Sequence, residues 1–277
     1  MLRNYFKIAL RQLKKQGFYS AIKIGGFALG IATCLLIALY IRFELSFDTG
    51  YANGDRLYRV VECFVMDNGT IGKGPAMPAP FAQELEKEFP QVEKAGRIMP
   101  YPLFGGAGSN EVRPEGKTQD TYEEGCVYAD QRILDQFQWQ MVYGKRETAL
   151  TEPNSIVITK QKADKYFPGV DPVGKVLYLN DDMKTPHKIG GVIANPPANT
   201  VWQYDFFLSL AGHELWNGEQ QTWMAQNYDV YVLLKPGVDA RVMETNIKNL
   251  YAKFLVAQMT QAGNPDPNSI EIGRAHV

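Results

Sequence analysis

The sequence predicts an α+β protein in which one N-terminal transmembrane helix is followed by a large mixed α/β domain on the outer side of a membrane. Residues 24–41, IGGFALGIATCLLIALYI, form a run of 18 positions without a charged side chain. Residues 1–23 contain six basic side chains and no acidic one, whereas residues 44–277 contain 22 Lys and Arg against 30 Asp and Glu, a net charge of −8. This asymmetry indicates a membrane at one end of the chain.

The apolar run has the length of a membrane-spanning helix, because about 1.5 Å per residue gives roughly 27 Å, near the thickness of a hydrocarbon core. Lys23 and Arg42 bound the run and can extend their charges to the interface. The basic segment resists translocation, so we expect the N-terminus inside and everything after Phe43 outside. A cleavable signal peptide is disfavoured because no small-x-small cleavage site follows. A buried soluble helix is disfavoured because the run is apolar on all faces.

The segment before the run predicts a basic amphipathic helix at residues 2–16, ended by Gly17. Apolar side chains recur at helical spacing at Leu2, Phe6, Ala9, Leu10 and Leu13. The opposite, membrane-surface basic face consists of Arg3, Lys7, Arg11, Lys14 and Lys15. We expect the helix to lie on the inner, anionic leaflet of the lipid bilayer. The alternative is a solvated helix that only supplies the positive charge inside.

Three glycines near the start of the apolar run predict a face for packing against another membrane helix. Gly26 and Gly30 form a GxxxG pair, and Gly25 adds another small residue. Without side chains at these positions, a neighbouring helix can approach closely. The same spacing also arises by chance in apolar helices, and the chain offers no second membrane-spanning candidate as a partner.

The remaining chain predicts one α+β domain of about 220 residues, large enough to bury a core. Periodicity and turn residues predict strands at 56–66, 122–129, 154–159, 176–179, 187–193, 204–210 and 228–234. Helices are expected at 77–89, 160–167 and 239–259. The predicted organisation is therefore a cytoplasmic helix (1–23), a transmembrane helix (24–43), an outer domain (44–262) and a polar tail (263–277).

Motifs for catalysis, cofactors or metals are missing from the sequence. Residues 169–175 match the GxxxxGK half of a phosphate-binding loop, but Val176 replaces the required Ser or Thr and a predicted strand follows, so a turn is expected. The three histidines show no metal-ligand spacing, and no CxxC, HExxH or GxSxG motif occurs. We therefore expect no enzymatic activity, no cofactor and no metal. An acidic outer domain also argues against nucleic acid as a partner.

Two further sets of residues allow simple structural interpretations. The adjacent acidic pairs Glu123–Glu124 and Asp181–Asp182 are interpreted as solvated charges. Cys63 and Cys126 lie in predicted strands of the outer domain. An oxidising compartment would permit a disulfide between them, but their positions in predicted strands favour separate burial.

Four segments together resemble the N-terminal part of a MacB/FtsX-type ABC transporter permease, of the kind common in Bacteroidetes. They are NYFKIALRQLKKQGFYSAIKIGGFALGIATCLLIALYI, FELSFDTGYANGDRLYRV, NSIVITKQKADKYFPGVDPVGKVLYL and IGGVIANPPANTVWQYDFFLSL. Each motif is loose alone, but their order and spacing are specific, and the resemblance extends over residues 1–260. It implies that the outer domain is a two-lobed, MacB-like periplasmic core domain.

The resemblance also implies a function and a set of partners. Such permeases work by mechanotransmission in the bacterial inner membrane, powered by a separate cytoplasmic ABC ATPase subunit. Further membrane helices, a second permease copy or paralogue, and a periplasmic adaptor or outer-membrane partner are expected with it. The alternatives are a single-pass extracytoplasmic sensor or receptor, and an FtsX-like regulator of a periplasmic cell-wall hydrolase. Fold analogy cannot choose the substrate.

The end of the chain suggests an artefact. The residues IGRAHV, from Ile272, translate ATC GGA AGA GCA CAC GTC, the start of a widely used sequencing adapter. The codon GAG for Glu271 would supply the adapter's leading AG. We interpret the tail as adapter read-through that truncated a longer coding sequence, and give Arg274 and His276 no functional interpretation. The alternative is a natural polar terminus, which genomic sequencing of the locus would reveal.

Overall fold

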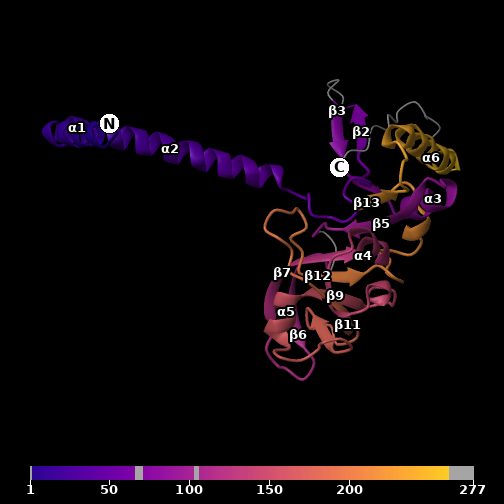
Figure 1. The fold of residues 1–277 in the computed structure, drawn as a ribbon. Coiled ribbons are helices and arrows are strands. Elements are labelled where there is room, and N and C mark those ends of the chain that lie inside the picture. Colours follow the sequence, from indigo (N-terminus) through magenta and orange to yellow (C-terminus); the bar gives the residue numbers. More distant parts are fainter. Residues whose placement is uncertain (1, 66–70, 103–105, 262–277) are drawn as a thin grey trace. The chain divides into compact units, whose positions relative to one another are not determined.

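The computed structural model describes residues 2–65, 71–102 and 106–261, and the polar tail lies outside them. The chain divides into two compact units, Met1–Thr49 and Gly50–Val277, which are considered separately (Figure 1). The α+β fold class is confirmed, because an N-terminal apolar helix precedes a sheet-rich domain.

The first unit consists of helices α1 (Leu2–Lys15) and α2 (Gly17–Leu45). The chain leaves helical geometry at Gln16, whose φ and ψ are −115° and 46°. Gly17 therefore opens the second helix rather than simply ending the first. At 29 residues, α2 is about 43 Å long, which exceeds the hydrocarbon core of a bilayer. Within the described residues, α2 alone is long and apolar enough to cross a membrane.

The second unit is built on an 11-stranded mixed sheet. Its strands are β1 (Leu57–Arg59), β4 (Ala76–Pro78), β5 (Val92–Met99), β6 (Gly108–Pro114), β7 (Thr121–Ala129), β8 (Met141–Gly144), β9 (Ser155–Thr159), β10 (Val176–Leu179), β11 (His187–Ile193), β12 (Phe206–Ser209) and β13 (Gln226–Leu234). The main path is β1-β13-β5-β7-β12-β9-β11-β10-β6, with β4 on β13 and β8 on β11. Strands β2 (Glu62–Val65) and β3 (Ile71–Gly74) form a separate hairpin.

One half of the sheet closes into a ring. Strand β6 pairs with β10 and also with β7, so β7, β12, β9, β11, β10 and β6 form a continuous cycle. Alternate residues of these strands fill its interior, as expected for a small closed barrel. This core includes Val112, Ile156, Leu177, Ile189 and Phe206. Helix α5 (Lys160–Tyr166) follows β9 and packs through the buried Ala163.

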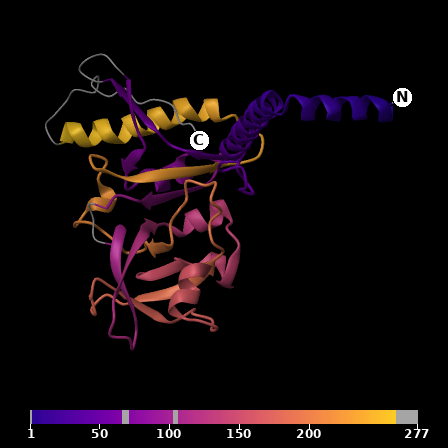
Figure 2. The same ribbon diagram turned by 90° about the vertical axis from the view of Figure 1, so that its left-hand side faces the viewer.

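The other half combines β1, β4, β5 and β13 with helices α3 (Phe81–Glu88) and α6 (Ala240–Gln261). Figure 2 shows α6 running alongside β13 at one end of the domain. Aromatic rings from both helices and the β12–β13 loop meet in the core here: the Phe81 ring centroid lies 6.0 Å from those of Trp223 and Tyr251. A third core cluster, beneath helix α4 (Gln131–Phe137), packs beside strands of both halves.

Several predicted boundaries were wrong for identifiable reasons. The strand expected at 56–66 is interrupted, and its parts β1 and β2 belong to different sheets. The helix expected from residue 77 begins only at Phe81, because Pro78 and Pro80 favour extended or cap positions, and residues 76–78 instead pair with β13. Strands β5, β6 and β8 and helix α4 were not predicted. The strands at 122–129, 154–159, 176–179, 187–193, 204–210 and 228–234 are confirmed to within two residues.

Candidate functional site

Helix α1 presents the predicted basic face to its surroundings. The side chains of Lys7, Arg11, Lys14 and Lys15 are all exposed. The backbone of Arg3 belongs to α1, but its side chain lies outside the described part of the structure. On the apolar side, Tyr5 and Phe6 are each 71% exposed. Large apolar side chains left uncovered beside a row of cations are typical of a helix that lies at a membrane surface.

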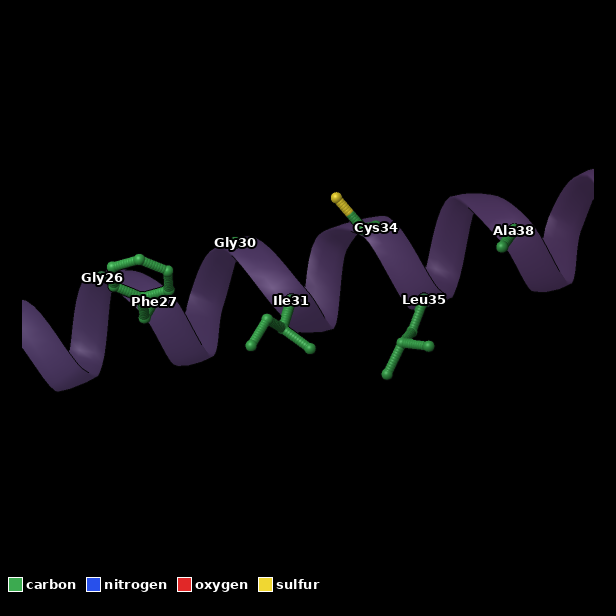
Figure 3. Close-up of a pocket in the computed structure, with 7 residues that line it drawn as sticks. All are labelled: Gly26, Phe27, Gly30, Ile31, Cys34, Leu35 and Ala38. Carbon is green, nitrogen blue, oxygen red and sulfur yellow. The ribbon is translucent and has the colours of Figure 1, made fainter.

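Helix α2 presents one row of small residues. Gly26, Gly30, Cys34 and Ala38 recur every four positions and line a shallow groove, with Phe27, Ile31 and Leu35 along one side (Figure 3). A Cβ atom added at Gly26 or Gly30 would meet nothing within 4 Å, so their lack of side chains serves no packing inside this unit. Gly25 does not line the groove. The predicted Gly26–Gly30 face thus extends over two further small residues.

The outer domain contains a partly buried charge cluster around Glu123 on β7. This carboxylate accepts hydrogen bonds from Lys162 Nζ at 2.5 Å, Lys165 Nζ at 2.6 Å and Tyr166 Oη at 2.5 Å, all from α5. Lys162 also lies 3.3 Å from the Asp205 carboxylate. The interpretation of Glu123 as a solvated charge is therefore wrong, since its side chain is only 5% exposed.

The charges in this cluster stabilise one another. Burial alone would raise the pKa of the Glu123 carboxyl, but the hydrogen bonds from Lys162, Lys165 and Tyr166 outweigh it and lower that pKa. Burial likewise disfavours the charged form of Lys162, but Glu123 and Asp205 raise its pKa overall. The cluster therefore links β7 to α5 through hydrogen-bonded charges.

A second network surrounds Arg97 on β5, which is 3% exposed. Its Nε and Nη2 donate to the two carboxylate oxygens of Asp130 at 2.8 and 3.1 Å. Its Nη1 donates to the Ala79 carbonyl at 2.7 Å and to Gln220 Oε1 at 2.8 Å. The guanidinium carbon also lies 4.9 Å from the ring centroid of Tyr228. One side chain thereby joins β5, the start of α4, the segment before α3 and the β12–β13 loop.

The residues considered for other chemistry do not converge. Within the described residues, no group of three or more His, Cys, Asp or Glu side chains is placed to hold a metal ion. The turn expected at residues 169–175 is confirmed, because β10 begins at Val176. Cys63 and Cys126 are free thiols, so of the two possibilities left open the unpaired one is found. Asp181 and Asp182 are exposed, as predicted.

A family model described as a MacB-like periplasmic core domain matches residues 20–250, from within α2 into α6. The chain belongs to this family. The resemblance to MacB/FtsX-type ABC transporter permeases is thereby confirmed, and the family implies an ATPase as a partner. A comparison with curated protein sequences gave no match.

Solved structures of transporter domains are similar to this MacB-like domain, and one of them aligns with a TM-score above 0.5. A domain of a protein described as a permease, from Porphyromonas gingivalis, aligns with a TM-score of 0.61 and 22% identity, covering 82% of this chain and 92% of that one. The periplasmic region of MacB from Actinobacillus actinomycetemcomitans gives 0.47 and 12%, covering 76% and 86%. The extracellular domain of the noncanonic ABC-type transporter YknZ from Gram-positive bacteria gives 0.43 and 13%, covering 78% and 98%.

Neither charge network of the MacB-like domain was predicted from the sequence. One signal for the first was present, because Lys162, Lys165 and Tyr166 have the i, i+3, i+4 spacing that places polar groups on one helix face. No comparable local signal exists for Arg97 and Asp130, which come together only through the pairing of β5 with β7.

Replacing Glu123 by glutamine is expected to lower the free energy of unfolding at pH 7 by about 2 kcal/mol, the scale of a hydrogen-bonded charge. Because the folded pKa of Glu123 is lowered, its contribution is complete above the unfolded pKa near 4.5 and is lost as the pH falls through the folded pKa. The difference in the free energy of unfolding between wild type and E123Q should therefore shrink below about pH 4.5. Urea titrations at several pH values measure it.

The neighbouring Glu124 offers a matched control for this prediction. It lies on the same strand but is exposed, so E124Q should change the free energy of unfolding by less than about 0.5 kcal/mol at any pH. A difference between wild type and E123Q that stays the same from pH 7 to pH 4 would contradict an ionised, hydrogen-bonded Glu123.

Proposed function

We propose that this chain is a permease subunit of an ABC-type transporter that works by mechanotransmission, exporting or extracting substrate from the periplasm or inner membrane. One observation carries the proposal: in a chain that matches the MacB-like family, a basic helix precedes a helix long and apolar enough to cross a membrane, and the sheet-rich unit begins at Gly50, shortly after that helix ends at Leu45. Such an arrangement suits a lever that carries ATP-driven movement from the membrane to the outer domain. ATP hydrolysis belongs, in this proposal, to a separate cytoplasmic ATPase subunit.

The proposed location is the bacterial inner membrane, with the N-terminus cytoplasmic and the main domain periplasmic. The six basic residues among residues 1–23, against none that is acidic, support this orientation through the positive-inside rule. We assign residues 1–23 to the cytoplasmic helix, 24–43 to the transmembrane segment and 44–262 to the periplasmic domain. The basic face of α1, from Arg3 to Lys15, is proposed to contact the anionic inner leaflet.

Affinity purification of the tagged chain, expressed from its own locus and solubilised in mild detergent, tests the transporter function. We expect an ABC ATPase to co-purify, and a second permease copy or paralogue with it. A periplasmic adaptor or outer-membrane partner would extend the assembly. Recovery of a cytoplasmic signalling module in place of an ATPase would favour a sensor. Loss of cell-wall hydrolase activation on deletion of residues 44–260, with export unaffected, would favour an FtsX-like regulator.

The small-residue row of α2 predicts how a neighbouring membrane helix is held. Leucine in place of Gly30 fills the row of small residues, so we expect helix–helix association to weaken by about 1–2 kcal/mol, which is roughly 5- to 30-fold. Ala28 lies about 160° around the helix from Gly30, and A28L adds similar bulk there as a control. Energy transfer between labelled chains in bilayers measures association. Equal loss in G30L and A28L would rule out a specific role for the row.

A further inference from the structure

The segment between α2 and β1 is attached to the outer domain at a definite place. Helix α2 ends at Leu45, the outer unit begins at Gly50, and β1 begins at Leu57. Between them the backbone forms local turns, in which the Gly54 N–H donates to the Tyr51 carbonyl at 3.1 Å. Hydrogen bonds within such local turns do not connect a segment to the rest of a domain. The attachment of this segment therefore depends on its side chains.

Tyr51 is the first side chain after the membrane helix that packs into a core cluster of the domain. Its ring stands edge-on to Phe137 at the end of α4, with the ring centroids 5.1 Å apart. Its hydroxyl is hydrogen-bonded to the hydroxyl of Thr200, which lies in the loop between β11 and β12 and is 3% exposed. One side chain therefore holds two segments that are far apart in the sequence.

Both partners of Tyr51, Phe137 and Thr200, make further contacts within the domain. Phe137 is 3% exposed and contacts Trp139, Trp202 and Tyr231, with centroid separations of 5.1, 4.3 and 5.4 Å. The Thr200 hydroxyl accepts a hydrogen bond from the Trp202 N–H at 3.2 Å. Tyr231 belongs to β13, the long strand that pairs with β1, β4 and β5. A displacement of Tyr51 would thus reach the sheet through rings in direct contact.

Arg56, five residues after Tyr51, makes a second set of contacts with the domain. Its Nη1 donates to the Leu234 carbonyl at 2.5 Å and lies 2.8 Å from the Glu93 carboxylate. Its Nη2 donates to Asn53 Oδ1 at 2.9 Å. Arg56 lies at the start of the β1–β13 pairing, because the Leu234 N–H donates to its carbonyl. Tyr51 therefore lies closer along the chain to the membrane helix than any residue of the sheet.

From these contacts we infer that Tyr51 is the positioning residue through which movement of α2 is passed to the periplasmic domain. The ring on Phe137 fixes where the segment enters the domain, and the hydroxyl on Thr200 fixes its direction. This inference rests on the proposed mechanotransmission, because only a moving helix needs a stiff attachment. Tyr51→Ala should loosen the attachment without unfolding the domain, whereas Tyr51→Phe should preserve it in large part.

The test uses the full chain in lipid nanodiscs, with Cys34 and Cys63 replaced by alanine. Spin labels are placed at Thr49→Cys and at the exposed Lys145→Cys, and pulsed EPR records the distance distribution between them. We expect a narrow distribution in wild type, at least a twofold broadening in Y51A, and most of the narrowing restored in Y51F. Tryptophan fluorescence, reporting only on the outer domain, should show that both variants stay folded.

Equal widths in wild type and Y51A would overturn the inference, as would a broad distribution in wild type. A distance distribution that broadens only in variants whose tryptophan fluorescence shows unfolding would also overturn it. Tyr51 would then contribute only to the stability of the domain. None of these outcomes bears on whether an ABC ATPase co-purifies with the chain. Failure of the attachment and failure of the transporter function are therefore separable.

Discussion

Replacing Arg97 by alanine is expected to lower the free energy of unfolding of the outer domain by about 3–5 kcal/mol, the cost of breaking a buried ion pair by removing one partner. The Asp130 carboxylate would lose both side-chain bonds from the guanidinium. The Ala79 carbonyl and Gln220 would each lose a donor in a region that excludes most water. Domains of this size are stable by only about 5–15 kcal/mol, so the effect should be conspicuous.

Intrinsic tryptophan fluorescence makes this measurement possible in the full chain. All four tryptophans belong to the outer domain: Trp139, Trp202, Trp216 and Trp223. Urea unfolding of the chain in nanodiscs therefore follows the outer domain without interference from α2. As a control, R97K retains the charge but lacks the planar fork, and should lose about 1–2 kcal/mol. A loss below about 1 kcal/mol in R97A would mean that the pair behaves like one exposed to solvent.

The second large effect is expected at Gly190 on β11. A Cβ atom placed there would lie 2.0 Å from the carbonyl oxygen of Ala149 and 2.9 Å from its carbonyl carbon. Both are backbone atoms, so relief requires a shift of the main chain beside a strand that pairs with β8, β9 and β10. We expect G190A to lose about 3 kcal/mol of stability, the upper range for overpacking a core.

The adjacent Gly191 provides a matched comparison for the loss of stability in G190A. At Gly191 the nearest atom to an added Cβ is the terminal methyl of Met141, at 2.7 Å, followed by Ala149 Cβ at 3.2 Å. A methionine end can rotate away, so G191A should cost about 1 kcal/mol. Thermal or urea unfolding of the two variants under identical conditions tests the difference. A G190A variant that loses no more stability than G191A would show that the Ala149 backbone can move.

Elements with strong local patterns could be predicted from the sequence. The uncharged run at 24–41 needed only composition and length to be placed in a helix. The apolar segments at 154–159 and 187–193 form strands β9 and β11 of the closed ring, and Lys188 is the one Lys, Arg, Asp or Glu residue that they contain. The break between α1 and α2 was also placed to within a residue, because Gln16 and Gly17 separate an amphipathic pattern from a wholly apolar one.

Elements whose character depends on distant partners could not be predicted. Strand β5 contains Glu93, Lys94 and Arg97, so it does not look like a central strand until Asp130 neutralises the buried guanidinium. Adjacent residues of a strand point to opposite faces, but this rule cannot say whether Glu123 or Glu124 is the buried one. Glu123 is the buried one because it pairs with Lys162 and Lys165 of α5. These lysines lie about 40 residues later in the sequence.

The two halves of the outer sheet meet along a very short seam. Strands β5 and β7 pair over only two positions, Ile98 with Ala129 and Met99 with Tyr128. The Asp130 N–H and the Arg97 carbonyl extend this pairing by one bond, at 2.9 Å. Twisting one half against the other would therefore strain few backbone hydrogen bonds, while the closed ring and the helix-covered sheet stay intact. Side chains therefore join the two halves where the backbone does little: the Arg97–Asp130 ion pair lies at the seam, and the core cluster beneath α4 includes residues of both halves.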